Sequence, residues 1–568
     1  MLVNHLKTGW RSSPRTLPSV DLLLLDAPQA PGEPRAVPPW ARSVGSVPFE
    51  THAIDRAIGS SSADFVLLWR SGEPFPAPAA IEALRAVGAD FVHGAMPAPE
   101  TLAELDLVLH DWSLIVPSPD RPASSWRLGP DACLMRTGAF RALGGFDLAF
   151  RDPRAAALDL GFRALRGGAL VEYRPELGTR PAAGSPLPRG DVYAFLLRHY
   201  GTGWARYVGL RHVLSQPWRA LPEHRAFREA QRSCRARSHA LQALAALGPH
   251  LDDRPLERLR DEAVSVVLPT LGRPDYVVQA LDSLARQTVP PNEVIVVDQN
   301  PPEARQPALY ASYARLGLTV LWQDQTGQAL ARNAAIEAAR GPWVFLFDDD
   351  SVAAPDLIEK HLRAVVGGRY HVSTGVSYSP GGSSDELPEL FRYPRLAQTL
   401  DTGNSLMSLR WARSVGGIDR AYDHGPGADG DLGTRLYLAG ARLLHNPRAS
   451  RTHFKAPSGG LRTHGVHKYN TDAGVLAPFP PPTQVYYQLR FLSPRQARER
   501  VLLQFVTSKL PRVARRLGWR TLPWVAARLL LGSLVLPLKY VRSVRRARAL
   551  LARSSRPPEI ALGAPTPP

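Results

Sequence analysis

The sequence predicts an α/β protein in which one domain occurs twice, and three observations support this. Apolar, strand-like runs alternate with helical patterns from Val264 onward, which is typical of a mostly parallel sheet with flanking helices. The apolar run 344–347 is followed at once by three carboxylates, Asp348–Asp350. A weaker copy of the same plan lies upstream. The chain of 568 residues is long enough for roughly two to four folding units.

The elements of the clearer copy follow one another from Val264. We predict strands at 264–268, 293–298, 319–322 and 344–347, and helices at 275–287 and 327–340. Ligands of a parallel sheet bind beyond the carboxyl ends of its strands. Asp298 and Asp348–Asp350 both fall at such ends, so the sequence predicts a binding site at this edge of the sheet.

The triplet Asp348–Asp350 indicates a bound cation. Three adjacent negative charges repel one another, and a folded protein tolerates them best where a counter-charge is held. Mg2+ or Mn2+ fits, because hard divalent cations prefer oxygen ligands and leave coordination positions for substrate phosphates. The alternative is an acidic turn after a strand, with no ligand.

The upstream copy matches the second copy at fixed spacings. Residues 134–135, 144–147 and 159–160 match 406–407, 416–419 and 431–432 at a constant offset of 272, and 65–69 match 343–347 at an offset of 278. At these offsets the positions of Asp348–Asp350 hold Arg70, Ser71 and Gly72, and the position of Asp429 holds Ala157. We interpret this as a tandem duplication. The first copy is expected to be a scaffold, or a binding domain without catalysis.

The charge balance points to an anionic partner. The formal net charge of +18 at pH 7 favours a nucleotide, a phospholipid surface or nucleic acid. Nucleic acid is not expected, because the sequence has no zinc-finger spacing, aromatic RNA-binding signature or basic DNA-reading helix. Cys133 and Cys234 support neither a disulfide framework nor a cysteine metal site, which fits a reducing cytosol. The start of the chain lacks an apolar core of signal-peptide length, so we expect a cytoplasmic protein.

The regions outside the two copies have compositions of their own. Residues 198–262 have a helical, basic pattern and are expected to link the copies, whereas 493–556 are predicted to form basic amphipathic helices. The apolar part of the second region, 523–538, is shorter than the ~20 residues that span a bilayer. It suits the inner face of the cell membrane, and a core-packed helix with a solvated basic tail explains the pattern as well. Residues 557–568 are predicted to be disordered.

Residues 263–455 resemble the family 2 glycosyltransferases, which have the Rossmann-like, nucleotide-sugar-binding fold called GT-A. The resemblance rests on six segments in the family's order and spacing, with the triplet as the DXD motif: 266–270, 296–298, 327–336, 345–350, 416–419 and 429–436. The first copy, within 1–197, looks like the same family in degenerate form. The resemblance therefore implies a catalytic GT-A domain at 263–492.

The resemblance also implies a metal site and a donor site. Asp348 and Asp350 would hold the metal, and His453 lies where many relatives place a histidine near it, although His445 and His464 compete for that role. Asp298 as a plain turn residue and Arg332 as a surface arginine are alternatives to donor binding. The residues implied to bind the nucleotide-sugar donor are Pro269, Thr270, Asp298, Arg332, Asp348 and Asp349.

A sugar transfer also needs a base that deprotonates the acceptor hydroxyl. Asp429 matches the family's catalytic aspartate, but Ala428 stands where relatives usually have an acidic residue. This departure leaves the base assignment between Asp429 and Asp431, and Asp429 is favoured. Asp431 is expected to begin the following helix, where its carboxylate would cap free amides.

The function implied by the resemblance is that of an inverting, metal-dependent glycosyltransferase of the hexosyltransferase type. It would move a sugar from a nucleoside-diphosphate sugar, with UDP-sugars the first expectation, to a hydroxyl of a glycan or lipid-linked acceptor in polysaccharide or glycolipid synthesis. Two other readings remain open. One is a metal-dependent nucleotidyl or phosphoryl transferase, and the other is a non-catalytic scaffold that binds glycan or nucleotide.

Overall fold

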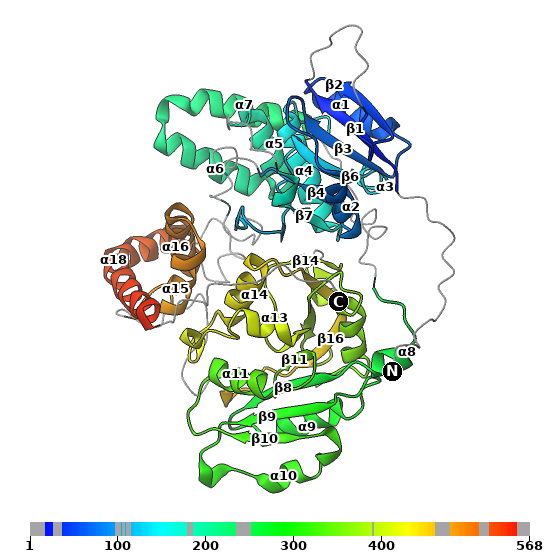
Figure 1. Cartoon of the computed structure of the whole chain (residues 1–568). Helices are drawn as coiled ribbons and strands as arrows, with labels where there is room; N and C mark the ends of the chain where they lie inside the picture. The colour runs from blue at the N-terminus through cyan, green and yellow to red at the C-terminus, as the bar shows by residue number, and fades with distance from the viewer. Residues whose placement is uncertain are drawn as a thin grey trace, which may run out of the picture.

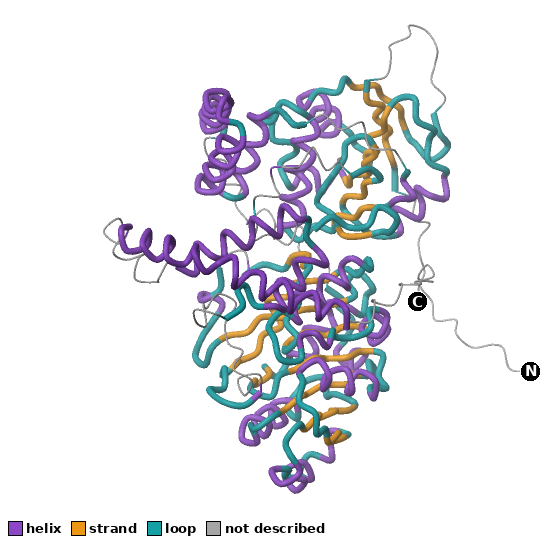
Figure 2. The backbone as a smooth tube through the Cα atoms, turned by 90° about the vertical axis from the view of Figure 1, so that its left-hand side faces the viewer, coloured by secondary structure: helices purple, strands orange, loops and turns teal. Residues whose placement is uncertain are grey.

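The computed structural model describes most of the chain in two stacked bodies with a helical addition. The described residues are 18–26, 37–96, 104, 108, 115–178, 186–234, 251–388, 391–460, 477–509 and 522–553. The expectations for the start of the chain, for His464 and for the tail 557–568 lie outside these residues. Figure 1 shows the first body above the second, and Figure 2 shows their strands as two separate groups.

The first body is built on a seven-stranded sheet with the order β2-β1-β3-β6-β4-β7-β5. Its strands are β1 (Val20–Leu25), β2 (Ser43–Val47), β3 (Phe65–Arg70), β4 (Phe91–His93), β5 (Ala123–Ser124), β6 (Ala132–Arg136) and β7 (Val171–Tyr173). Its helices are α1 (Thr51–Ser60), α2 (Pro78–Ala86), α3 (Thr137–Ala142), α4 (Pro153–Arg166), α5 (Arg189–His199), α6 (Gly201–Ser215) and α7 (Ala220–Ser233). Helices α6 and α7 pack against α5, so residues 198–234 extend this body.

The second body is built on a nine-stranded sheet, and it contains every strand and helix predicted between Val264 and Phe347. The strands are β8 (Val264–Thr270), β9 (Glu293–Asp298), β10 (Thr319–Trp322), β11 (Trp343–Phe347), β12 (Ser351–Ala353), β13 (Val372–Tyr378), β14 (Arg395–Ala397), β15 (Asn404–Ser408) and β16 (Leu443–His453). The helices are α8 (Leu256–Arg260), α9 (Pro274–Leu284), α10 (Pro307–Ala311), α11 (Gln328–Ala338), α12 (Leu357–Val365), α13 (Leu409–Ser414) and α14 (Ala428–Leu438). Strands β8 and β11, buried from Val264 and Val344 onward, lie side by side and parallel, so their carboxyl ends meet at one edge of the sheet.

The two sheets share strand order and strand direction. In the second sheet, the path β9-β8-β11-β15-β13-β16-β14 repeats the path of the first, and each of the six neighbouring pairs has the same parallel or antiparallel direction. The register agrees as well, since Leu67 faces Leu134 in the first sheet and Phe345 faces Leu406 in the second. These four positions are related by the sequence offsets of 278 and 272.

Buried ion pairs recur at the same offset. Arg163 pairs with Asp159 at 2.8 Å in α4, and Arg435 pairs with Asp431 at 2.7 Å in α14. Each aspartate also forms an ion pair with an arginine of a later helix, Arg198 in the first body and Arg490 in the second. Because a buried carboxylate is costly without a counter-charge, these pairs hold the helix and the turn before it in one arrangement.

The C-terminal helices α15 (Pro482–Phe491), α16 (Pro494–Lys509) and α18 (Leu522–Arg553) lie beside the level where the two bodies meet (Figure 1). Helix α15 packs against α18, and its Arg490 forms ion pairs with Asp419 and Asp431 of the second body. Across the junction of the bodies, Arg369 pairs with Asp90 and Arg442 with Glu172, each at 3.2 Å. Within the part of the chain that the structure describes, no helix is long and apolar enough to cross a membrane.

Candidate active site at the carboxyl ends of β8 and β11

A pocket of about 540 Å³ lies at the sheet edge that the sequence singles out. Thr270 ends β8, the triplet follows β11, and His453 ends β16. Segments far apart in the sequence therefore meet in one cavity. The predicted residues that line it are Pro269, Thr270, Arg332, Asp348, Asp349, Asp350, Asp429 and His453.

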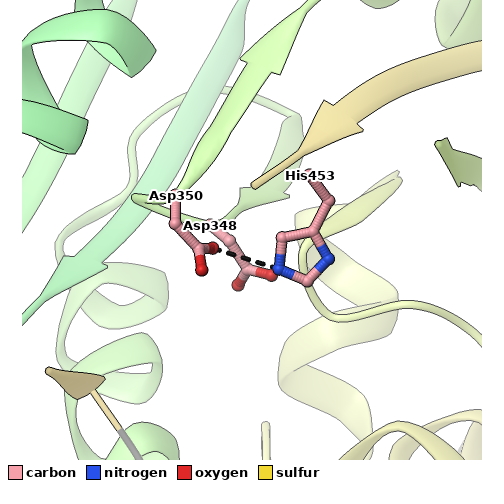
Figure 3. Close-up of side chains that lie close together, drawn as sticks. All are labelled: Asp348, Asp350 and His453. Atoms are coloured by element: carbon pink, nitrogen blue, oxygen red, sulfur yellow. Dashed lines mark ion pairs between the residues drawn. The ribbon is translucent and has the colours of Figure 1, made fainter. Parts of the chain in front are cut away.

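Asp348, Asp350 and His453 form a cluster that could hold a metal ion. One ligand atom from each lies within 4.8 Å of the others, and His453 Nε2 lies 3.2 Å from Asp350 Oδ1. Figure 3 shows the imidazole of His453 directed at the two carboxylates. Two carboxylates and one imidazole form a donor set that suits Mn2+ or Mg2+, so these residues fit the predicted metal.

The rival histidine His445 lies elsewhere. Its Nε2 lies 2.9 Å from the carbonyl oxygen of Phe391, and it does not line this pocket. Of the competing histidines that the structure describes, only His453 stands with the triplet.

Three arginines compensate the charge of the triplet. Asp348 pairs with Arg332 at 2.6 Å and with Arg451 at 2.9 Å, and Asp349 pairs with Arg273 at 2.8 Å. Burial alone would raise the pKa of Asp348, but the charges of Arg451 and Arg332 hold that pKa well below its ordinary value. An incoming diphosphate would meet the same guanidinium groups, which complement phosphate oxygens.

The pKa of Asp349 moves in the opposite direction. Burial raises it to about 6, and the neighbouring charge of Asp350 adds to the increase while Arg273 opposes it. Thr270 donates its hydroxyl proton to Asp349 Oδ2 at 2.8 Å. Thr270 and Asp349 therefore act together as one wall of the pocket, and Asp349 is not part of the metal cluster.

Asp429 has the environment of a general base. Its side chain opens into the pocket, in the first turn of α14. Reduced hydration by the surrounding protein raises its pKa to about 6, and the charge of Asp401 also acts to raise it, while hydrogen bonds from Thr402 lower it. The backbone N–H and the hydroxyl of Thr402 both donate to Asp429 Oδ1, at 3.1 and 2.5 Å. A pKa near the working pH suits a group that accepts a proton during catalysis.

Arg451 and Asp401 also line the pocket, and the sequence did not predict them. Arg451 is buried and donates to Asp348 Oδ2 at 2.9 Å and to both carboxylate oxygens of Asp401 at 3.1 Å. Asp401 precedes Thr402, which holds Asp429. A continuous chain of polar contacts thus joins the triplet to the candidate base. Arg451 stands two residues before His453 in β16, and that spacing places two side chains on one face of a strand, which is the signal that could have revealed it.

The expectation that Asp431 begins its helix was wrong. Helix α14 begins at Ala428, after Gly427, which has a φ of 118° and lies in the left-handed region that glycine adopts without strain. Asp431 therefore lies inside the helix, fully buried and paired with Arg435 and Arg490. This role leaves Asp429 as the aspartate that faces the pocket.

Asp298 is the one predicted site residue that does not line the pocket. It ends β9 and is 2% exposed. Its carboxylate accepts the Tyr310 hydroxyl at 2.7 Å and the backbone N–H of Asn300 at 2.8 Å. Gln299, the next residue, lines the pocket instead.

Comparison with known proteins matches part of the second body to a protein family. The model of the family described as glycosyl transferase family 2 matches residues 265–413. Residues of this chain are 23% identical to the chondroitin synthase of Escherichia coli over 252 residues, which is 36% of this chain and 37% of that protein. They are 34% identical to the succinoglycan biosynthesis protein ExoO of Rhizobium meliloti over 101 residues, 18% of this chain and 29% of that protein. The chain thus spans about a third of the length of these relatives.

Solved structures with a similar arrangement include a mannosyltransferase from Pyrobaculum calidifontis in complex with GDP-Man and Mn2+. It is 17% identical, with a TM-score of 0.33, and the match covers 51% of this chain and 85% of that one. A second is Staphylococcus aureus TarS in complex with UDP-GlcNAc, 16% identical with a TM-score of 0.31, over 44% of this chain and 66% of that one.

Proposed function

Residues 265–413 form a glycosyltransferase family 2 domain, and on this premise we propose that the chain is an inverting, metal-dependent transferase. It moves a hexosyl group from a nucleoside-diphosphate sugar to a hydroxyl of a glycan or lipid-linked acceptor, in polysaccharide or glycolipid synthesis. The observation that carries the proposal is the presence, in one pocket, of a metal-ligand cluster and a separate carboxylate with a pKa of about 6.

Each group in the pocket has a task in such a transfer. Asp348, Asp350 and His453 would hold a divalent cation, which would neutralise charge on the departing diphosphate. Arg332 and Arg273, which now pair with the triplet, offer guanidinium groups to the same oxygens. Asp429 accepts the proton of the acceptor hydroxyl as that oxygen attacks the anomeric carbon. Attack from the face opposite the leaving group inverts the anomeric centre.

The nucleotide moiety is proposed to be UDP, in the part of the pocket formed by Pro269, Thr270 and Gln299. Thr270 is buried and its hydroxyl is fixed by a hydrogen bond to Asp349. A ligand would therefore contact a threonine side chain held in one orientation. The family match over residues 265–413 disfavours the alternative of a phosphoryl or nucleotidyl transferase.

We also propose that the first body is a degenerate copy of the second. The shared strand order and the recurring ion pairs support this. Arg70 stands in the position of Asp348 and pairs with Asp131 at 2.8 Å, in the position of Gly403. The charges at this edge therefore neutralise each other internally, which suits a scaffold rather than a metal site.

Helix α18 supports a peripheral contact with an anionic membrane, which we propose as the location of the enzyme. Its residues include many arginines and no acidic residue. Leu530, Leu531 and Leu534 are 70%, 68% and 79% exposed, and spacings of three and four residues place them on one face of the helix. An apolar face flanked by basic residues fits the boundary between headgroups and acyl chains.

The substitution Asp429→Asn tests the proposed reaction. It removes the proton acceptor but keeps the shape of the side chain and its contact with Thr402. We expect transfer to fall at least about a hundredfold, while the affinity for UDP and Mn2+ in isothermal titration stays close to that of the wild type. Transfer at the wild-type rate in this variant would contradict the assignment, and so would a parent protein that binds no nucleotide.

A further inference from the structure

A second cavity of about 660 Å³ lies on the other side of Asp429. The two cavities share Ser377, Asp401, Gly427 and Asp429 in their linings. The candidate base therefore stands at the junction of two spaces, one beside the triplet and one remote from it. A volume of this size is typical of a site for a small organic ligand, about 300–1,000 Å³.

Half of the residues that line the second cavity lie outside the family match at 265–413, and the other half lie between 374 and 401, within it. Helices α15 and α16 supply one wall, and Ile115 of the first body contributes to the lining. Apolar and aromatic side chains form much of it, including Leu387, Phe391, Leu400 and Tyr487. Tyr487 donates to or accepts from the Thr434 hydroxyl at 2.9 Å, which fixes its ring. The ring lies close to Gly430, the neighbour of Asp429, because a Cβ at Gly430 would be 3.8 Å from it.

Two buried polar groups in this cavity lack a partner. Thr483 and Gln484, in the first turn of α15, are 8% and 7% exposed. Thr483 Oγ1 and Gln484 Oε1 have no hydrogen-bond partner among the described residues. Because a buried polar atom without a partner costs about 1–3 kcal/mol, native proteins seldom leave two together unless a ligand or water completes them.

The apolar walls and the two unpaired polar atoms together indicate which chemical groups a ligand of this cavity would carry. An amide oxygen can only accept a hydrogen bond, so a ligand that pairs with Gln484 Oε1 must offer a donor such as a hydroxyl. The aromatic and aliphatic walls complement apolar C–H groups of a ligand. A pyranose ring offers both, with hydroxyls at its edge and C–H groups on its faces, whereas an acyl chain would leave Thr483 and Gln484 unpaired. Arg395 and Arg500 also line the cavity and add positive charge, which would favour a sugar with a carboxylate.

We propose that this cavity binds a sugar residue of the acceptor. Gln484 and Thr483 form hydrogen bonds with its hydroxyl groups, and Tyr487 contacts a face of its ring. The inference rests on the proposed function and names the acceptor class for the same active site. A hydroxyl of this sugar reaches Asp429, which takes its proton. The acceptor oxygen forms the new bond to the anomeric carbon of the donor, and the bond from that carbon to the diphosphate oxygen breaks with its electron pair leaving on the diphosphate.

Saturation-transfer difference NMR on the full-length chain tests this placement. The probes are the methyl glycosides of glucose, galactose, N-acetylglucosamine and glucuronic acid, each titrated with and without UDP and Mn2+. We expect at least one probe to bind, and its affinity to fall about tenfold or more in the double variant Thr483→Val with Gln484→Leu, because two hydrogen bonds to the sugar are lost.

Gln488→Leu is the matched control. Gln488 lies one turn further along α15, is buried, also carries an unpaired amide atom, and does not line the cavity. We expect sugar binding to be unchanged in this variant. Binding that survives in the double variant, or is lost equally in Gln488→Leu, would overturn the placement. So would the absence of binding by every probe.

Thermal-shift measurements with UDP or GDP and Mn2+ separate the two proposals. If these nucleotides stabilise the wild type and the double variant equally while no sugar binds, only the acceptor inference fails. If no nucleotide stabilises the wild type, the proposed function itself fails.

Discussion

The substitution Asp401→Asn should shift the pH dependence of transfer to lower pH. The pKa of Asp429 is raised from 3.8 to about 6, first by reduced hydration and then by the charge of Asp401. The substitution removes that charge and keeps a side-chain oxygen for Arg451 and for the Gly403 N–H, which Asp401 now accepts at 2.9 Å. Asp348 makes a smaller contribution in the same direction as Asp401.

The size of the pKa shift in Asp401→Asn follows from the causes that raise the pKa of Asp429. Since reduced hydration and Asp348 remain, the pKa of Asp429 in the variant should lie between 3.8 and 6, about one unit below the wild-type value. A base must be ionised to accept a proton, so the acid limb of the rate profile moves down with the pKa. At about pH 5 the ionised fraction rises from roughly one-tenth to one-half, and activity relative to each plateau rises about fivefold.

The assay is the initial rate of nucleoside-diphosphate release between about pH 4.5 and pH 8 at saturating donor and metal, a range that spans the expected acid limb. Asp385→Asn is the control, because its side chain is 87% exposed and lies outside both pockets, and its profile should match the wild type. An acid limb that stays in place in Asp401→Asn, in a variant with wild-type circular dichroism, would refute the reasoning that Asp401 sets the basicity of Asp429.

Three further outcomes follow from the structure. Asp429→Asn should increase thermal stability relative to the wild type more at neutral pH than near pH 3.8. The reason is that a carboxylate whose pKa is raised in the folded state destabilises the fold as the pH rises from 3.8 through about 6. A difference in melting temperature that stays constant across that pH range would contradict the assignment. Gly403→Ala should reduce donor turnover at least about tenfold, because a Cβ there would collide with the carboxylate of Asp348 and the guanidinium of Arg451, whereas Gly138→Ala, where a Cβ meets nothing within 4 Å, should retain activity. The triple variant Leu530→Ser, Leu531→Ser and Leu534→Ser should bind anionic liposomes about tenfold or more weakly in sedimentation, and unchanged binding would remove α18 as the membrane contact.

The sequence predicted the strands around the site well because each is a short apolar run that ends at a polar residue. Val264–Thr270 and Trp343–Phe347 are nearly completely buried, so their composition alone distinguishes them from surface segments. The triplet could be singled out because it directly follows the apolar run 344–347. The proposed duplication rests on constant offsets in the sequence. His453 could be proposed only by resemblance, since nothing local in β16 links it to the triplet, which lies far earlier in the chain.

What the sequence did not predict depends on contacts between distant segments. Asp401 and Arg451 meet across 50 positions, and neither belongs to a recognisable motif. The start of α14 was misplaced because Asp431 resembles a helix cap in sequence, while the left-handed conformation of Gly427 starts the helix earlier. The second cavity joins α15, α16 and Ile115, and no local pattern reveals that these segments face Asp429.

The most direct test of the central claim is metal-dependent release of a nucleoside diphosphate from a panel of nucleotide sugars. The wild-type protein should release it from one donor in the presence of Mn2+ and should lose that activity with EDTA. Asp350→Ala, which removes one of the three candidate metal ligands of the cluster, should lose the activity at every practical Mn2+ concentration. Release that is equally fast without metal, or in Asp350→Ala, would contradict the account.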